Sequence, residues 1–340
     1  MGVNVIGGVA AKVILFTAAA AVSAILILLL RGFLRRHALS RPNARSSHRE
    51  PIPQGGGIAV IAAALVTAMV FLLLSDKTAA INLWPTFAAA AFLAAVGAWD
   101  DIHAIEVAPR LVLQLAAIVV VIAALPSGLR IVPSLPWGIE RVFLILGGLW
   151  FVNLFNFMDG IDWMTVAEVV PVTMGLVLIG AMSALPDYGV IVALSLGGAT
   201  IGFAPFNRPV AKLFLGDVGS LPLGLLLGWL LVLLAGRGHL AAALLLPLYY
   251  LADATITLLR RLMRGETLWK AHRDHFYQRA VDDGFAVGQV IARVFAVNVV
   301  LVALACTTVQ MQSLAADLVA LALGAGAVGW LLVRFERGRA

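Results

Sequence analysis

The residues best suited to chemistry lie in one short stretch, Asn153-Leu-Phe-Asn156-Phe-Met-Asp159-Gly-Ile-Asp162, which joins two long apolar runs. An ionised carboxylate in hydrocarbon costs roughly 2.5–3.5 kcal/mol even on the lowest scales, so such residues usually mark a site. At helical spacing, Asn153 shares a face with Asn156, Asn156 with Asp159, and Asp159 with Asp162. The stretch therefore predicts a polar site; a polar helix end at the membrane interface is the alternative.

A second block places two adjacent carboxylates, Asp100 and Asp101, directly after an apolar run, with Arg110 following. Adjacent carboxylates repel one another and need a nearby cation to stay ionised together. Hard oxygen ligands indicate Mg²⁺, with Mn²⁺ possible, rather than zinc. A solvated pair of loop carboxylates remains the alternative.

A third block reads Gly-Asp217-Val-Gly-Ser220 and opens another apolar run. Upstream, Lys212 offers a positive charge for a phosphate, and Phe214 offers a ring on which a base can stack. The same pattern is also typical of a simple capping turn with Asp217 or Ser220 as the N-cap.

Histidines and arginines gather in the largest loop, in His272-Arg273-Asp-His275-Phe-Tyr-Gln-Arg279. The histidine spacing could suit zinc, but neither an HExxH helix nor a cysteine completes such a site. Binding of phosphates is the favoured interpretation, and an amphipathic interfacial helix is the alternative.

A second basic block contains Arg45 and His48 and precedes three glycines, residues 55–57. Bare backbone N–H groups at a helix N-terminus suit phosphate oxygens. The glycines could equally serve only close helix packing, and the basic residues could contact anionic lipid headgroups.

The composition is that of an all-α polytopic membrane protein. Hydrophobic residues make up 62% of the chain, against roughly 45–50% in soluble domains. The net charge of +6 does not indicate nucleic-acid binding, because no soluble module carries it. We expect a single transmembrane domain over residues 1–340.

Apolar stretches long enough to cross a membrane predict about eleven helices. They lie near residues 10–30, 55–75, 82–99, 110–126, 138–156, 165–184, 189–204, 219–235, 240–260, 287–308 and 314–333. With the N-terminus outside, most of the 24 Lys and Arg residues fall in the cytoplasmic segments, as the positive-inside rule requires. The predicted topology is N-out and C-in, and it places every block described above on the cytoplasmic face.

Together and in this order, the blocks resemble the polyprenyl-phosphate N-acetylhexosamine-1-phosphate transferases of glycosyltransferase family 4. The resemblance covers most of the chain, from residue 45 to residue 279, and is carried by RSSHREPIPQGGG, WDD followed by RLVLQ, NLFNFMDGIDWM, NRPVAKLFLGDVGS and HRDHFYQR. It implies Mg²⁺-dependent transfer of a sugar-1-phosphate from a UDP-sugar to undecaprenyl phosphate, releasing UMP, in the bacterial inner membrane.

The resemblance also implies a role for each residue. Asp217 looks like the principal Mg²⁺ ligand, helped by Asp159 beside the diphosphate. The implied catalytic residues are Asp100, Asp101, Asp159, His272 and His275. The implied substrate-binding residues are Arg45, His48, Arg110, Asn153, Asn156, Asp162, Lys212, Phe214, Arg273 and Arg279.

Two departures bear on the substrate. The muramoyl-pentapeptide branch has three consecutive histidines where this chain has His272-Arg-Asp-His275, and Trp163 replaces a family glycine. We therefore expect a UDP-GlcNAc or UDP-N-acetyl-6-deoxyhexosamine donor, at the start of a cell-envelope polysaccharide. The muramoyl-pentapeptide reaction is one alternative. An ion-coupled transporter is another, and it would need ionisable residues on both faces.

Overall fold

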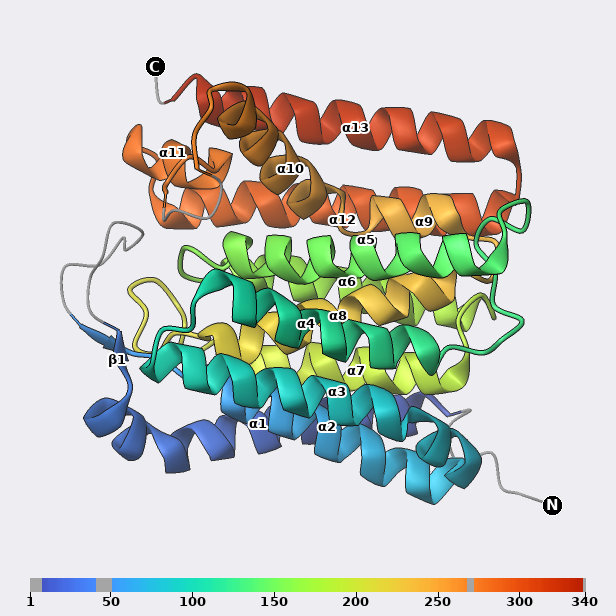
Figure 1. Cartoon of the computed structure of the whole chain (residues 1–340), viewed down its shortest axis with the longest axis horizontal. Coiled ribbons are helices and arrows are strands. Elements are labelled where there is room, and N and C mark those ends of the chain that lie inside the picture. Colours follow the sequence, from blue (N-terminus) through green and yellow to red (C-terminus); the bar gives the residue numbers. More distant parts are fainter. Residues whose placement is uncertain (1–7, 41–50, 268–271, 339–340) are drawn as a thin grey trace.

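Long apolar helices make up nearly all of the computed structural model, which describes residues 8–40, 51–267 and 272–338. Eight of these helices are long and apolar enough to cross a membrane: α1 (Val9–His37), α2 (Gly56–Ser75), α3 (Lys77–Ile102), α5 (Trp137–Met158), α6 (Met164–Ala181), α8 (Asp217–Ala235), α12 (Val287–Met311) and α13 (Leu314–Glu336). Two shorter apolar helices, α4 (Val107–Ala123) and α7 (Asp187–Phe203), lie among them. This arrangement, visible in Figure 1, confirms the all-α polytopic class.

The helix expected over residues 240–260 is divided into two. A short α9 (Leu240–Leu245) is followed by α10 (Leu248–Met263), and Pro247 lies at the break. Proline lacks the backbone N–H that would continue the helix, so α10 can leave the direction of α9. In Figure 1, α10 lies obliquely to α12 and α13.

Outside the bundle helices, the described chain contains one small sheet of two strands and one short helix. Two-residue strands β1 (Leu39–Ser40) and β2 (Ile52–Pro53) pair antiparallel after α1. The seven-residue helix α11 (Phe276–Asp282) follows α10. Both lie at the left-hand end of the bundle in Figure 1, where α3, α5 and α7 end and α6 and α8 begin. All the polar blocks that have described residues therefore meet at one end.

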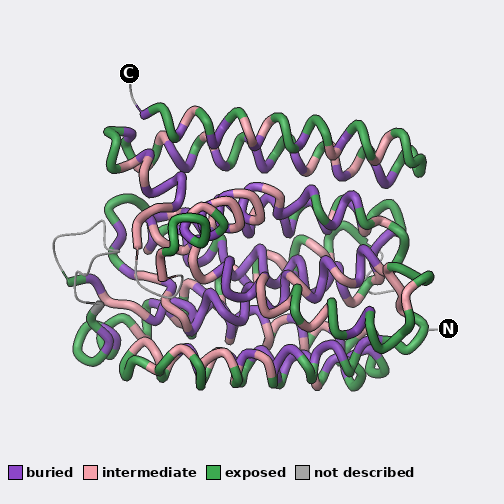
Figure 2. Tube along the Cα trace, turned by 45° about the horizontal axis from the view of Figure 1, so that its top comes forward, coloured by how far each residue is buried: buried purple, intermediate pink, exposed green. Residues whose placement is uncertain are grey.

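The centre of the bundle is α8, which is the most deeply buried of the eight long apolar helices. It packs against α2, α3, α5, α7 and α9. Figure 2 shows the buried trace in the middle of the molecule, with exposed residues along the outer helices. Because α8 is central, its N-terminal residue, Asp217, is brought to the middle of the polar end.

Candidate active site

Asp217 lies where three helices converge. Its Oδ1 accepts a hydrogen bond from Asn156 Nδ2 in the last turn of α5, at 2.8 Å. Its Oδ2 lies 3.8 Å from Arg110 Nη1 in the first turn of α4. Asn156 also donates to Ser220 Oγ, one turn further along α8, at 2.8 Å. The ends of α4, α5 and α8 thus share one polar cluster.

The two adjacent aspartates at the end of α3 point to different partners. Asp100 forms a 3.0 Å ion pair with Arg110. Asp101 accepts the backbone N–H groups of Asp217 and Val218, at 2.9 and 3.2 Å. A carboxylate at a helix N-terminus satisfies orphan N–H groups and complements the helix dipole. Asp101 therefore holds Asp217 in place, whereas Asp100 faces the cation.

The glycines of residues 55–57 serve close packing. The N–H groups of Gly56 and Gly57 already donate to the carbonyls of Phe214 and Leu215, at 2.9 and 2.8 Å. A Cβ at Gly57 would lie 2.3 Å from Gly219 Cα. Of the two interpretations of these glycines, the structure favours helix packing over phosphate binding, because these two backbone donors are taken.

Asp159 lies in the connection between α5 and α6, and its carboxylate accepts a hydrogen bond from the Thr165 hydroxyl. Burial raises the pKa of the Asp159 carboxyl to about 6; the Thr165 hydrogen bond opposes this shift, and the charges of Asp217 and Asp162 add to it. The carboxylates thus lie close enough to repel one another, which favours a bound cation.

Asp162 and Trp163 tie this connection to the loop of residues 204–216. Asp162 is 4% exposed, and its Oδ2 accepts the Ala211 N–H at 2.9 Å. Trp163 has a left-handed backbone (φ 62°), which glycine adopts without cost. Its N–H donates to Asn207 Oδ1 at 2.8 Å, and its indole N–H donates to the Ala204 carbonyl at 2.6 Å. These contacts hold a tryptophan at a position with a left-handed backbone.

The other predicted substrate-binding residues differ in their surroundings. Lys212 is exposed at the polar end, and Phe214 is half-buried beside it. Asn153 lies deeper along α5 and donates to buried Gln114 at 2.7 Å. Arg45 and His48 lie outside the described residues.

The histidine block is anchored inside the protein. His275 is 2% exposed, its Nδ1 lies 3.1 Å from Asp253 Oδ1, and its ring stacks on His272 at 5.1 Å. Asp253 is not among the predicted site residues. A carboxylate within an apolar run is the signal that singled out residues 153–162, and it also applies to Asp253.

Both arginines of this block form ion pairs within the chain. Arg273 lies 2.7 Å from Asp282, and Arg279 lies 3.8 Å from Glu336 on α13. These pairs hold α11 against its neighbours, so a role in phosphate binding stays a prediction for both arginines.

Helix α11 packs directly on the connection that contains Asp159. The Tyr277 hydroxyl donates to the Phe157 carbonyl at 3.0 Å. A Cβ at Gly160 would lie 2.1 Å from Tyr277 Oη and 2.8 Å from Gln278 Nε2. The histidine block and the Asp159–Asp162 connection are therefore one packed unit.

The carboxylates suit Mg²⁺, which also binds waters and phosphates, better than a metal ion held by protein side chains alone. Across the described ranges, no group of three or more His, Cys, Asp or Glu side chains could hold a metal ion. Mg²⁺ keeps several waters and takes one or two carboxylates together with substrate phosphates. Asp217 and Asp159, whose charges interact, are the candidate ligands among these carboxylates.

Comparison with known proteins identifies the class of enzyme. A family profile described as glycosyl transferase family 4 matches residues 83–235. An undecaprenyl-phosphate alpha-N-acetylglucosaminyl 1-phosphate transferase of Salmonella typhi is 30% identical over 266 residues, covering 74% of this chain and 71% of that protein. A probable undecaprenyl-phosphate N-acetylglucosaminyl 1-phosphate transferase of Bacillus subtilis is 25% identical over 282 residues, covering 78% and 77%.

A phospho-N-acetylmuramoyl-pentapeptide-transferase of Enterococcus faecalis is 38% identical, but over only 130 residues, which is 38% of this chain and 39% of that protein. These matches and the polar end of the bundle define a membrane-embedded glycosyl-1-phosphate transferase. The chain belongs to glycosyl transferase family 4.

The contact at Gly160 leads to a first prediction. In Gly160→Ala, the new methyl group must displace Tyr277 or Gln278, so we expect a loss of about 1–3 kcal/mol in stability and of about 100-fold in transferase activity. Thermal unfolding in detergent and UMP release measure the two effects. Gly326→Ala on α13, where no atom lies within 4 Å, is the matched control. Wild-type values for both variants would contradict the prediction.

Proposed function

We propose that this protein transfers an N-acetylhexosamine-1-phosphate from a UDP-sugar to undecaprenyl phosphate and releases UMP. The observation that carries the proposal is the convergence of Asp100, Asp101, Asp159 and Asp217 with Arg110 at one end of a membrane bundle. The names of relatives that match 78% and 74% of this chain agree with it.

The reaction is an in-line phosphoryl transfer. A phosphate oxygen of the acceptor forms a bond to the β-phosphorus of the UDP-sugar, and the bond from that phosphorus to the bridging oxygen of UMP breaks. A phosphate has its second pKa near 6, so no strong base is required at neutral pH. Both reactants are anionic, and Mg²⁺ held by Asp217 and Asp159 would neutralise charge as UMP leaves.

The residues of the chain favour direct attack over a covalent aspartyl intermediate. Both oxygens of Asp101 accept backbone N–H groups at the start of α8. The oxygens of Asp100 accept the Ile105 N–H at 2.7 Å and pair with Arg110. Each of these aspartates is therefore held by partners that lower its nucleophilicity, whereas Arg110 is placed to offset negative charge beside Asp217.

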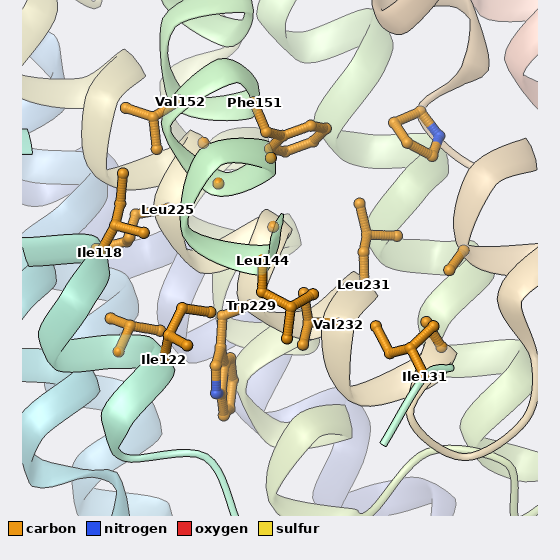
Figure 3. Close-up of a pocket in the computed structure, with 18 of the residues that line it drawn as sticks. Ile118, Ile122, Ile131, Leu144, Phe151, Val152, Leu225, Trp229, Leu231 and Val232 are labelled. Carbon is orange, nitrogen blue, oxygen red and sulfur yellow. The ribbon is translucent and has the colours of Figure 1, made fainter. Parts of the chain in front are cut away.

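An apolar pocket supports a polyprenyl acceptor. It has a volume of about 220 Å³ and lies among α4, α5, α8, α9 and the start of α10. Figure 3 shows its apolar lining, which includes Ile118, Phe151 and Trp229. Gly224, also in the lining, is seven residues after Asp217 on α8, which is about 10 Å along the axis. The pocket can hold a stretch of prenyl chain while the phosphate lies at the carboxylates.

The relatives and the distribution of Lys and Arg support a donor class and a location for the reaction. The matches that cover 78% and 74% of this chain are to N-acetylglucosaminyl 1-phosphate transferases, and the match to the muramoyl-pentapeptide enzyme covers 38%. We propose a UDP-N-acetylhexosamine donor and a reaction that starts a cell-envelope polysaccharide. We propose the cytoplasmic face of the bacterial plasma membrane as its location, because the positive-inside rule puts the polar end there. The transporter alternative has no support from these relatives.

Loss of the proposed metal ligand tests the reaction. We expect Asp217→Asn to lower transfer at least about 100-fold, and EDTA to abolish it in the wild type. Purified protein would receive undecaprenyl phosphate, Mg²⁺ and a panel of radiolabelled UDP-sugars, including UDP-GlcNAc and UDP-MurNAc-pentapeptide. Asp187→Asn is the matched control, because Asp187 is likewise the first residue of an apolar helix but lies at the other end of the bundle. The proposal is contradicted if the wild type forms neither a lipid-linked product nor UMP with any of the donors.

The apolar pocket gives a separate prediction. Gly147 lines the pocket and has open space around it, so Gly147→Leu should occupy the pocket without harming the fold. We expect the KM for undecaprenyl phosphate to rise about tenfold, or ~1.4 kcal/mol, and the KM for a two-isoprene phosphate to change little. Gly326→Leu, in open space on α13, is the control. An equal effect on the long and short acceptors would exclude the pocket as the prenyl site.

A further inference from the structure

A buried carboxylate on α10 collects hydrogen bonds from residues 275–277 and from its own helix. Asp253 is completely buried. Its Oδ1 lies 3.1 Å from His275 Nδ1 and accepts the Phe276 N–H at 3.1 Å. Its Oδ2 accepts the Tyr277 N–H at 3.2 Å and the Tyr249 hydroxyl at 3.1 Å. Asp253 therefore caps the N-terminus of α11 from outside that helix.

These partners require an acceptor at both oxygens. The backbone N–H groups of Phe276 and Tyr277 can only donate, and one of them lies at each oxygen of Asp253. An asparagine has one oxygen and one NH₂ group. In either orientation, its NH₂ group would face a backbone N–H, so one buried donor would lose its partner.

The same contacts fix the orientation of the histidine pair. With Nδ1 against Asp253, the His275 ring is held in one orientation, and Nε2 lies on the side of the ring away from Asp253. The ring lies between those of His272 and Tyr277, at 5.1 and 5.8 Å. Tyr277 in turn donates to the carbonyl of Phe157, two residues before Asp159.

We propose that Asp253 is a positioning residue that holds the His272–His275 pair against the connection containing Asp159. The consequence for turnover rests on the proposed transferase function. The consequence for the local structure of α11 does not.

The test compares two buried carboxylate-to-amide changes. Glu168 on α6 is 1% exposed and accepts a hydrogen bond from Asn298 Nδ2 at 2.7 Å. Its Oε1 and Asn298 Oδ1 are both buried without a hydrogen-bond partner among the described residues. A glutamine at 168 keeps an oxygen for the Asn298 NH₂ group and adds a donor. Glu168→Gln is therefore the matched control for Asp253→Asn.

We expect Asp253→Asn to lower kcat about 10–100-fold, with the KM for undecaprenyl phosphate within about twofold of wild type, and Glu168→Gln to match the wild type. In the double variant Asp253→Asn/His275→Ala, kcat should be no lower than in the worse single variant, because the two residues act as a unit. Equal kcat in Asp253→Asn and Glu168→Gln, or additive losses in the double variant, would overturn the proposal.

Hydrogen exchange of the peptide covering residues 272–282 gives a readout independent of the reaction. The backbone amides of this peptide should exchange faster in Asp253→Asn than in the wild type, and at the wild-type rate in Glu168→Gln. If Asp253→Asn exchanges faster than the wild type but the wild type shows no transferase activity, the proposed function fails and the positioning role stands. Unchanged exchange in a folded Asp253→Asn protein would overturn the positioning role itself.

Discussion

The N-terminus of α8 is the point on which the polar end depends. It lies in the middle of the bundle, where its free backbone N–H groups have little water to bind. Asp101, 116 residues earlier in the chain, supplies the acceptor for two of them. A Cβ at Gly97 would lie 2.3 Å from the Asp217 carbonyl oxygen, so glycine is needed for this approach of α3 to α8. One half-buried carboxylate, Asp101, and one small residue, Gly97, thus determine where Asp217 lies.

Five of the acidic residues of this end fall into two groups by what they contact. Asp101, Asp162 and Asp253 accept backbone N–H groups from other segments and so fix the chain around the site. Asp159 and Asp217 form side-chain hydrogen bonds instead and lie where their charges interact. A protein that buries so many carboxylates stays stable because the first group is matched to donors, which leaves the second group for chemistry.

The sequence predicts the fold class and the gathering of the polar blocks well, because apolar length and loop charge are local properties. It could not predict which aspartate caps a helix, since the Asp101 contact joins residues far apart in the chain. Likewise, the choice between helix packing and phosphate binding for residues 55–57 depended on the contact of Gly57 with Gly219, which the sequence does not show. Pro247 carried a local signal for the break between α9 and α10, but the apolar run around it favoured one continuous helix.

A site lined with carboxylates can receive phosphates only if cations outweigh its own charge. Arg110 is the one cation seen between Asp100 and Asp217 in the described part of the chain, at 3.0 and 3.8 Å. Arg273 and Arg279 are already paired with Asp282 and Glu336. One guanidinium shared by two carboxylates cannot also neutralise two anionic substrates. This shortage of positive charge is the physical reason to expect a divalent ion at Asp217.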